Sequence, residues 1–368
     1  MLAPPQHLGS HTLQTPHSGY QWDGYTHGFF EGWYFRITLP RPRATFAFMY
    51  SIQDPIGGQP YSGGVAQVLG PGDTYLCRSF PQAQLFWAWS EGLGLGHWRQ
   101  PSSHQSPGFL LPLTFARQIQ EGYQVTATWH QGQLKDPVCG EMVAWQYQVW
   151  PIYGWGNPGQ VQQSTAGWLS QWPIFEPGWQ VLMAHGLATG WILWQGQRYR
   201  FHQVPAYSEK NWGRAFPKRW FWLQCNAFDQ QPEISLTAAG GHRQILGWTE
   251  TVGMVGLHYQ GQFYEFVPWN AMVSWHVSPW GDWHIKAERS DYVLELHGTT
   301  AHPGVGLRAP TEQGVMYCCR HTAQGQVSFS LWRKFTGRLS LILQATSQQA
   351  ALEIGGSPWC DPWHKPNS

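Results

Sequence analysis

The sequence predicts an all-β protein built from two tandem antiparallel β-barrels with little helix. The chain has 368 residues, which is enough for two domains of ordinary size. Aromatic residues make up 16% of the chain and charged residues only 12%, about half of the ~25% usual in soluble proteins. The chain also contains 42 Gly and 27 Pro. Because aromatic residues favour strands and Gly and Pro favour tight turns, this composition indicates many short strands joined by turns.

Short apolar and aromatic runs bounded by turn-forming residues follow one another along the chain, as in barrels and sandwiches. In the first half these predicted strands are GWYFRITLP (32–40), ATFAFMYSI (44–52), GGVAQVLG (63–70), YQVTATWHQGQL (123–134), AWQYQVWPI (144–152) and GWILWQGQRYRF (190–201). In the second half they are RWFWLQCNAF (219–228), ISLTAAGG (234–241), RQILGWTE (243–250), FYEFVPW (263–269), MVSWHV (272–277), DWHIKAER (282–289), YVLELHG (292–298) and LSLILQATS (339–347). Helical periodicity is almost absent, and TAGWLSQW (165–172) is the candidate helix.

Two segments have similar patterns and suggest a weak internal repeat. FEGWYFRITLPRPRATFAFMYSI and YSEKNWGRAFPKRWFWLQCNAF each contain a Glu followed by a Trp, then a basic, Pro-containing turn and an aromatic strand. Glu31 and Trp33 of the first segment therefore correspond to Glu209 and Trp212 of the second. We predict that each segment opens one barrel, with domains at 1–202 and 203–368. Antiparallel barrels of about eight strands can hold one small ligand inside.

Several classes of function are disfavoured by the composition. The net charge is +1 and the basic residues are scattered, so nucleic-acid binding is not expected. No apolar run approaches the ~18–20 residues of a membrane span, and the first residues lack the pattern of a signal or transit peptide. The chain is therefore expected to be cytoplasmic. The six Cys are irregularly spaced and there is no Gly-rich phosphate motif, so we expect no metal and no cofactor.

The 25 Trp residues have two interpretations. They pack cores and barrel girdles, or they line a large cavity for an apolar ligand, since Trp offers a wide contact area and a π face. One scarce carboxylate lies in AYSEKNWG (206–213), next to the apolar run RWFWLQCNAF. Glu209 is thus a candidate buried acid, or it forms an ion pair at the junction of the two barrels.

Seven segments together carry a resemblance to a known family. They are PHSGYQWDGYTHGFFEGWYFRITLP (16–40), FAFMYSIQDP (46–55), GGVAQVLGPG (63–72), TAGWLSQWPIFEPGWQVLMAHGLATGWILW (165–194), AYSEKNWGRAFPKRWFWLQCNAF (206–228), TAAGG (237–241) and GLHYQGQFYEFVP (256–268). In this combination they resemble the tocopherol cyclases, over about residues 16–355. EGWYF and EKNWG also recur in a wider lipocalin-like group that includes carotenoid 1,2-hydratases. The resemblance implies two lipocalin-like barrels, and since no transit segment is recognised, the chain is expected to be of the cyanobacterial rather than the plastid form.

The resemblance also implies a reaction of the intramolecular lyase class of isomerases. A phytyl-substituted benzoquinol, such as 2-methyl-6-phytyl-1,4-benzoquinol or its dimethyl analogue, would be converted into δ- or γ-tocopherol, a form of vitamin E. A proton adds to the alkene of the first prenyl unit, and the phenol oxygen closes the chromanol ring on the resulting cation. The reaction is redox-neutral and needs no cofactor. Because the substrate is lipophilic, peripheral contact with a thylakoid or plasma membrane is expected.

This chemistry needs a strong acid in a dry site, because an isolated alkene is a very poor base. Burial among aromatic side chains can keep a carboxylic acid protonated at neutral pH. We therefore expect Glu209 to be the proton donor, with Tyr207 as a relay and Asn211 orienting the carboxyl group. The rings expected to face the developing cation are Trp212, Trp220 and Trp222.

Other candidates are weaker. In the first repeat, Glu31 is the parallel candidate acid and Trp33 is a candidate substrate-binding residue. Asp23 is close in sequence to His27, and such a pair could serve as acid or base, although Asp-Gly also favours a turn. Glu265 would be a buried acid if its side chain points inward. Two alternative functions remain open at this stage: hydration of an isoprenoid alkene, and non-catalytic carriage of a prenyl quinone.

Overall fold

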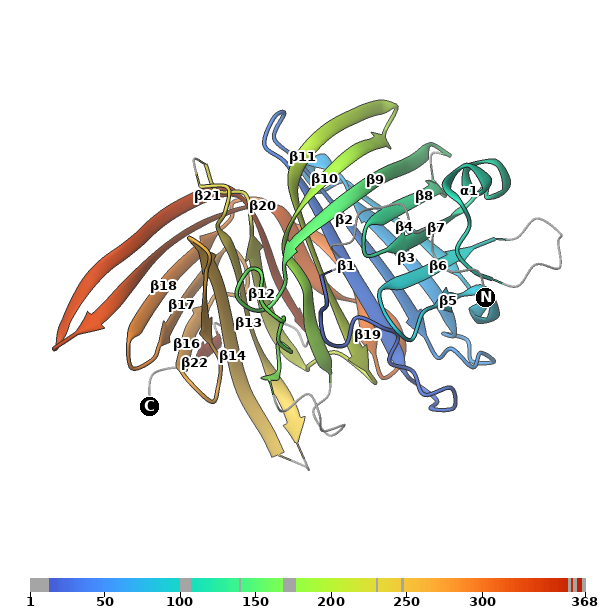
Figure 1. The fold of residues 1–368 in the computed structure, drawn as a ribbon. Coiled ribbons are helices and arrows are strands. Elements are labelled where there is room, and N and C mark those ends of the chain that lie inside the picture. Colours follow the sequence, from blue (N-terminus) through green and yellow to red (C-terminus); the bar gives the residue numbers. More distant parts are fainter. Residues whose placement is uncertain are drawn as a thin grey trace.

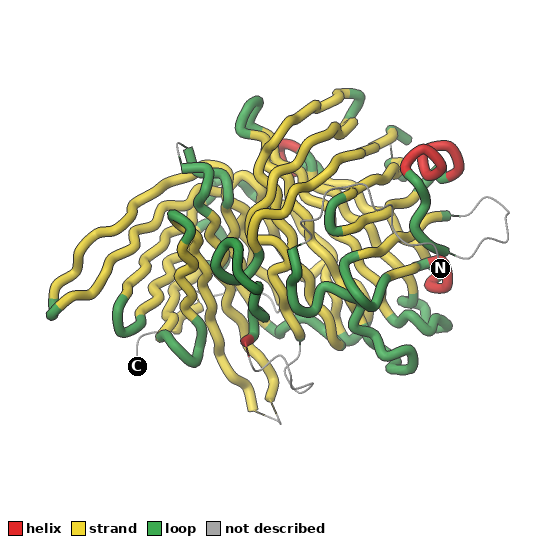
Figure 2. The backbone as a smooth tube through the Cα atoms, viewed as in Figure 1, coloured by secondary structure: helices red, strands yellow, loops and turns green. Residues whose placement is uncertain are grey.

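The computed structural model describes residues 13–99, 107–138, 140–167, 177–229, 231–245, 248–356, 359 and 363–365. Strands dominate these residues (Figure 2), and the helical segments are η1 (Pro71–Asp73), η2 (Ala83–Leu85) and α1 (Pro112–Gln118). The predicted all-β class with little helix is confirmed. Of the candidate helix at 165–172, residues 168–172 lie outside the described residues. In the described part, no helix has the length and hydropathy to cross a membrane.

The strands form two antiparallel sheets, which lie side by side as two curved surfaces (Figure 1). In spatial order, the first sheet contains β4 (Tyr75–Phe80), β3 (Gly63–Leu69), β2 (Ala44–Gln53), β1 (Phe30–Leu39), β11 (Gln197–Gly213), β10 (Gly178–Trp194), β9 (Met142–Tyr153), β8 (Trp129–Lys135), β7 (Gly122–Thr126), β6 (Gly94–Trp98) and β5 (Trp87–Ala88). The strand of this sheet that comes first in the sequence, β1, thus pairs with the strand that comes last in the sequence, β11.

The second sheet has the same plan. In spatial order it contains β15 (Gln262–Phe266), β14 (Trp248–Tyr259), β13 (Ser235–Ile245), β12 (Arg219–Cys225), β21 (Arg338–Gly356), β20 (Gly314–Phe335), β18 (Tyr292–Thr299), β17 (Asp282–Glu288), β16 (Met272–Val277) and β22 (Trp363–Lys365), and β19 (Val305–Thr311) pairs with β20. Its first strand, β12, pairs with the long late strand β21. Two tandem antiparallel sheets of like plan are therefore present where the sequence predicted two lipocalin-like antiparallel barrels.

The internal repeat is placed differently from the prediction. The expected boundary at 202/203 falls inside β11, which runs unbroken from Gln197 to Gly213 in the first sheet. The stretch AYSEKNWG closes the first sheet rather than opening the second, and Glu31 lies directly opposite Trp212 across the β1–β11 pair. The similar Glu and Trp patterns therefore belong to neighbouring strands of one sheet. The chain passes to the second sheet at residues 214–218, and the division into two domains stays a prediction.

Side chains alternate between two environments along the strands where the sheets meet. In β1, Phe35 belongs to the core of the first sheet, whereas Tyr34 packs with residues of the second sheet. In β12, Phe221 belongs to the core of the second sheet, whereas Trp222 packs with Tyr207 of β11. This period of two is the normal geometry of a strand. Each sheet thus buries its own core on one face and contacts the other sheet with its opposite face.

Candidate active site

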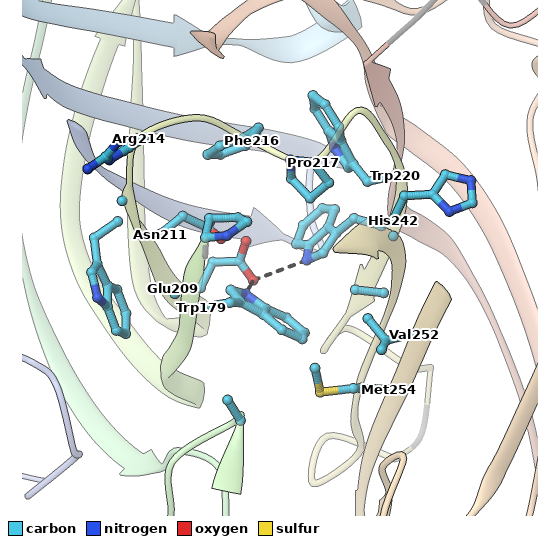
Figure 3. Close-up of a pocket in the computed structure, with 18 of the residues that line it drawn as sticks. Trp179, Glu209, Asn211, Arg214, Phe216, Pro217, Trp220, His242, Val252 and Met254 are labelled. Atoms are coloured by element: carbon cyan, nitrogen blue, oxygen red, sulfur yellow. Dashed lines mark hydrogen bonds between the residues drawn. The ribbon is translucent and has the colours of Figure 1, made fainter. Parts of the chain in front are cut away.

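A cavity of about 520 Å³ lies between the two sheets. It is lined on one side by β10, β11 and the segment before β1, and on the other by β12, β13, β14 and β21. Six of the predicted site residues line it: Asp23, Glu209, Asn211, Trp212, Trp220 and Trp222. Figure 3 shows Glu209 near Trp179 on one side of the cavity, with Val252 and Met254 of the second sheet opposite. The candidate site is therefore formed between the two sheets rather than inside the core of either one.

The Glu209 carboxyl group is buried and receives three hydrogen bonds on a single oxygen. Tyr207 Oη donates to Oε2 at 2.7 Å, Trp179 Nε1 at 3.0 Å and Trp222 Nε1 at 3.1 Å. The dashed lines in Figure 3 mark the two indole bonds. Burial raises the pKa of Glu209 to about 7, and the three donors oppose this rise.

This arrangement decides which oxygen of Glu209 carries the proton. An indole N–H can only donate, so Oε2 must accept and the proton of the neutral acid sits on Oε1. Among the described residues, no hydrogen bond reaches Oε1, and Figure 3 shows this oxygen on the side of the carboxyl group away from the two indoles. Glu209 is thus a buried acid with a raised pKa, which can present a proton from Oε1 to a molecule in the cavity.

The local sequence explains part of this geometry. Alternation along β11 places Tyr207, Glu209 and Asn211 on the face toward the second sheet, while Lys210 points to the opposite face. The two indole donors come from elsewhere, Trp179 from β10 and Trp222 from β12. The acid is therefore assembled only when the two sheets meet.

Lys210 pairs with Glu31 and not with its neighbour in the sequence. Its Nζ lies 2.5 Å from Glu31 Oε1, and both side chains are 0% exposed. Lys210 Nζ also donates to the Gly19 carbonyl, and the Gln21 N–H donates to Glu31 Oε2 at 2.8 Å. Burial raises the pKa of Glu31 and the Lys210 charge opposes this rise. The ion pair considered for Glu209 is therefore not formed: Lys210 pairs with Glu31 instead, and no cation among the described residues pairs with Glu209. Glu31 does not line the cavity.

The two Trp residues paired in the internal repeat flank this ion pair. Lys210 Nζ lies 5.9 Å from the Trp33 ring centroid and 5.0 Å from that of Trp212. Trp33 is buried in the first core and does not line the cavity, whereas Trp212 does. Only the second of these predicted substrate-binding residues therefore has access to a ligand.

The expected Asp23–His27 pair is not formed. Both oxygens of Asp23 are used in a turn, where they accept bonds from the Tyr25 and Thr26 N–H groups and from the Thr26 hydroxyl. The hydroxyl bond lowers the pKa of Asp23. His27 is largely exposed, and its Nδ1 lies 3.6 Å from Asp54 Oδ1. Asp23 lines the edge of the cavity as a turn residue, consistent with the Asp-Gly signal.

Glu265 lies outside the cavity lining. Its Oε1 accepts a hydrogen bond from Trp155 Nε1 at 2.7 Å, and its Oε2 accepts one from Asn270 Nδ2 at 3.4 Å. Burial raises the pKa of Glu265, and the Trp155 bond opposes the rise. Its side chain is thus engaged in local structure at the end of β15.

Sequence reasoning missed a second carboxylate at the cavity, Glu353 of β21. Its Oε1 accepts a hydrogen bond from Trp220 Nε1 at 2.7 Å, and its Oε2 lies 3.0 Å from His321 Nδ1. It also missed Trp179. A signal for Glu353 existed, because ALEIGG is an apolar strand with a lone carboxylate, the same pattern that singled out Glu209.

A group of possible metal ligands lies away from this cavity. Asp282, His284 and His297 present ligand atoms within 4.8 Å of one another on β17 and β18. Asp282 Oδ1 is 3.0 Å from His284 Nε2, and Asp282 Oδ2 is 3.1 Å from His297 Nε2. Sequence reasoning missed it as well, because the two His residues meet only when the neighbouring strands β17 and β18 pair. The group shares no residue with the Glu209 cavity.

Comparison with known proteins gives a consistent result. Residues 27–356 match the model of a family described as tocopherol cyclase-like. The chain is 44% identical over 377 residues to a probable chloroplastic tocopherol cyclase of Oryza sativa subsp. japonica, covering 95% of this chain and 80% of that protein. It is also 44% identical over 378 residues to a chloroplastic tocopherol cyclase of Zea mays, covering 96% and 80%.

A solved structure supports the fold alone. The crystal structure of CghA with Sch210972 superposes with a TM-score of 0.51 at 9% identity, covering 90% of this chain and 89% of that chain.

Proposed function

This chain belongs to the tocopherol cyclase-like family, and from that premise we propose that it is an enzyme that closes the chromanol ring of a phytyl-substituted benzoquinol. The substrate is 2-methyl-6-phytyl-1,4-benzoquinol or its dimethyl analogue, and the product is δ- or γ-tocopherol. The observation that supports this most is the Glu209 carboxyl group, whose pKa burial raises to about 7 and whose Oε1 is left free at an aromatic cavity.

Glu209 starts the reaction as the proton donor. Its Oε1–H adds a proton to the less substituted carbon of the first prenyl alkene, which leaves a tertiary cation and a Glu209 carboxylate. The phenol oxygen then bonds to the cationic carbon and loses its own proton. The substrate and product are isomers, so no oxidant or reductant enters the balance. Tyr207, Trp179 and Trp222 stabilise the carboxylate formed in the first step, because all three donate to Oε2.

Aromatic rings stabilise the cation while it exists. Trp179, Trp212, Trp220 and Trp222 line the cavity beside Glu209. A cation over an aromatic face is worth ~2 kcal/mol or more in a desolvated site, so two such rings lower the barrier appreciably. A cavity of about 520 Å³ is in the ordinary range for small ligands. We place the quinol head and the first prenyl unit there.

Turnover by the purified protein tests this proposal. Reduced phytyl quinol is incubated anaerobically with the protein, and products are separated by liquid chromatography with mass detection. We expect chromanol to form, and to form equally after treatment with a chelator and desalting. The corresponding quinone should not react, because it lacks a phenolic nucleophile. A tertiary alcohol as the product would make the protein a hydratase, and binding without turnover would make it a carrier; either result refutes the cyclase.

The lipophilic tail of the substrate bears on where the enzyme works. A phytyl quinol partitions into bilayers, so we propose that the protein takes it from a membrane surface as a peripheral protein. Washing membranes with high salt or alkaline carbonate should then release the protein. Resistance to both treatments would contradict peripheral attachment.

A further inference from the structure

Two carboxylates from different sheets face the same cavity, and the proposed mechanism uses only one of them, Glu209. Glu209 lies on β11 of the first sheet and Glu353 on β21 of the second, and both line the cavity. Their electrostatic interaction is one of the causes that raise the pKa of Glu209. Two interacting carboxyl groups with different partners are the usual arrangement for an acid and a base in one site.

The two carboxylates are held by successive Trp residues of one strand. Trp222 Nε1 donates to Glu209 Oε2, and Trp220 Nε1 donates to Glu353 Oε1. Residues two apart on a strand lie on the same face, about 6.6 Å apart. The two donors therefore hold the two carboxyl groups side by side at the cavity wall, where both can reach one substrate.

The second carboxylate differs from the first in its other partner. Glu353 Oε2 lies 3.0 Å from Nδ1 of His321, a ring that is 0% exposed. The His321 ring stacks on Trp222 at a centroid distance of 6.0 Å and lies 6.0 Å from the Tyr34 ring, which fixes its plane. Among the described residues, Glu209 contacts aromatic donors and no basic group, whereas Glu353 contacts a histidine. In the tautomer with hydrogen on Nδ1, His321 donates to Oε2 and orients the Glu353 carboxylate toward the cavity.

We propose that Glu353 is the general base that removes the phenol proton as the ring closes, and that His321 is the residue that positions it. This inference rests on the proposed function. As the phenol oxygen bonds to the tertiary cation, its O–H bond breaks and the proton passes to the Glu353 carboxylate. The site then holds a Glu209 carboxylate and a protonated Glu353. Return of one proton from Glu353 to Glu209, directly or through solvent, restores the starting state, so atoms and charge balance.

Product partition in a Glu353→Gln variant tests the base. The cation still forms in this variant, because Glu209 is intact, but ring closure lacks its proton acceptor. General base catalysis contributes roughly 10²–10⁴-fold, so the rate of chromanol formation should fall by a factor in that range. The cation should then leak to a tertiary alcohol or to alkenes with a shifted double bond. In D₂O these uncyclised products should carry deuterium. Glu295→Gln, the same change at a half-exposed site on β18, should give only chromanol at the wild-type rate.

The outcomes separate this inference from the proposed function. Failure of the wild-type protein to form chromanol refutes the function itself. Chromanol as the sole product of Glu353→Gln at the wild-type rate overturns the base. Loss of both substrate consumption and deuterium incorporation, in a variant that stays folded, also overturns it, because Glu353 would then act before the cation forms.

Two further variants keep the test decisive. If Glu353→Gln does not fold, Glu353→Asp keeps the charge but withdraws the carboxylate by one methylene, and it should show the same leak at a lower level. Exclusive chromanol formation by Glu353→Asp at the wild-type rate overturns the inference. His321→Gln should raise the fraction of uncyclised product and leave deuterium incorporation in place, a partition that loss of stability alone would not change.

Discussion

Replacement of Glu209 by Gln separates the proton from the shape of the side chain. The amide oxygen can take the place of Oε2 and accept the three bonds from Tyr207, Trp179 and Trp222, so the NH₂ group takes the place of Oε1 at the cavity. The opposite orientation would set the amide N–H groups against two indole N–H groups, which cannot accept. The variant should therefore fold and keep the cavity, but it has no transferable proton. General acid catalysis contributes ~10²–10⁴-fold, and kcat should fall by about that factor.

The same substitution has a predicted effect on stability. The pKa of Glu209 is about 7 when folded, against an ordinary value of 4.5. Between these pH values the folded state holds a proton that the unfolded state releases, so the free energy of unfolding of the wild type decreases as the pH rises. Across this pH range the free energy of unfolding of the wild type falls by about 3 kcal/mol, at 1.36 kcal/mol per pH unit. Gln does not titrate, so the stability of Glu209→Gln relative to wild type should increase by about that amount from pH 4.5 to above pH 7.

Urea unfolding of both proteins at several pH values, with single-turnover kinetics at neutral pH, measures these two effects. The titration of all other groups contributes equally to both proteins, so it cancels in the difference between their free energies of unfolding. In the wild type, kcat should also fall as the pH rises above about 7, because the protonated acid is the active form. A folded Glu209→Gln protein with kcat within tenfold of the wild type would refute the assignment of the donor. An unchanged difference in stability across this pH range would refute the argument from burial.

Two other substitutions test the surroundings of the acid. Glu31→Gln leaves the buried Lys210 charge unpaired and should destabilise the protein by ~3–5 kcal/mol, visible as a lower Tm, whereas Glu295→Gln breaks an exposed pair worth ~0–1 kcal/mol. Equal Tm values for these two variants would contradict the buried pair. Trp222→Phe removes one donor that lowers the pKa of Glu209, so the decline of kcat should move to higher pH while the ring is retained. A decline that stays in place or moves to lower pH would show that the indole bond does not stabilise the carboxylate.

The sequence by itself determined the strands and the scarce groups. Apolar runs between turn residues predicted most strands, because alternation and turn chemistry are local properties. Helix α1, in a Pro-containing segment without clear periodicity, was not anticipated. Glu209 was singled out because a carboxylate in so apolar a setting is costly unless it is used or paired, and this reasoning depends on composition alone.

Only the tertiary structure decided which groups meet. From adjacency, Lys210 was the natural partner of Glu209, yet neighbouring residues of a strand point to opposite faces, and pairing of β1 with β11 brought Glu31 to Lys210 instead. The donors to Glu209 and the second carboxylate, Glu353, come from strands far away in the sequence. Their convergence depends on the order of strands and on the packing of one sheet against the other. These are set by the summed burial of many side chains, so no short stretch of the chain encodes them.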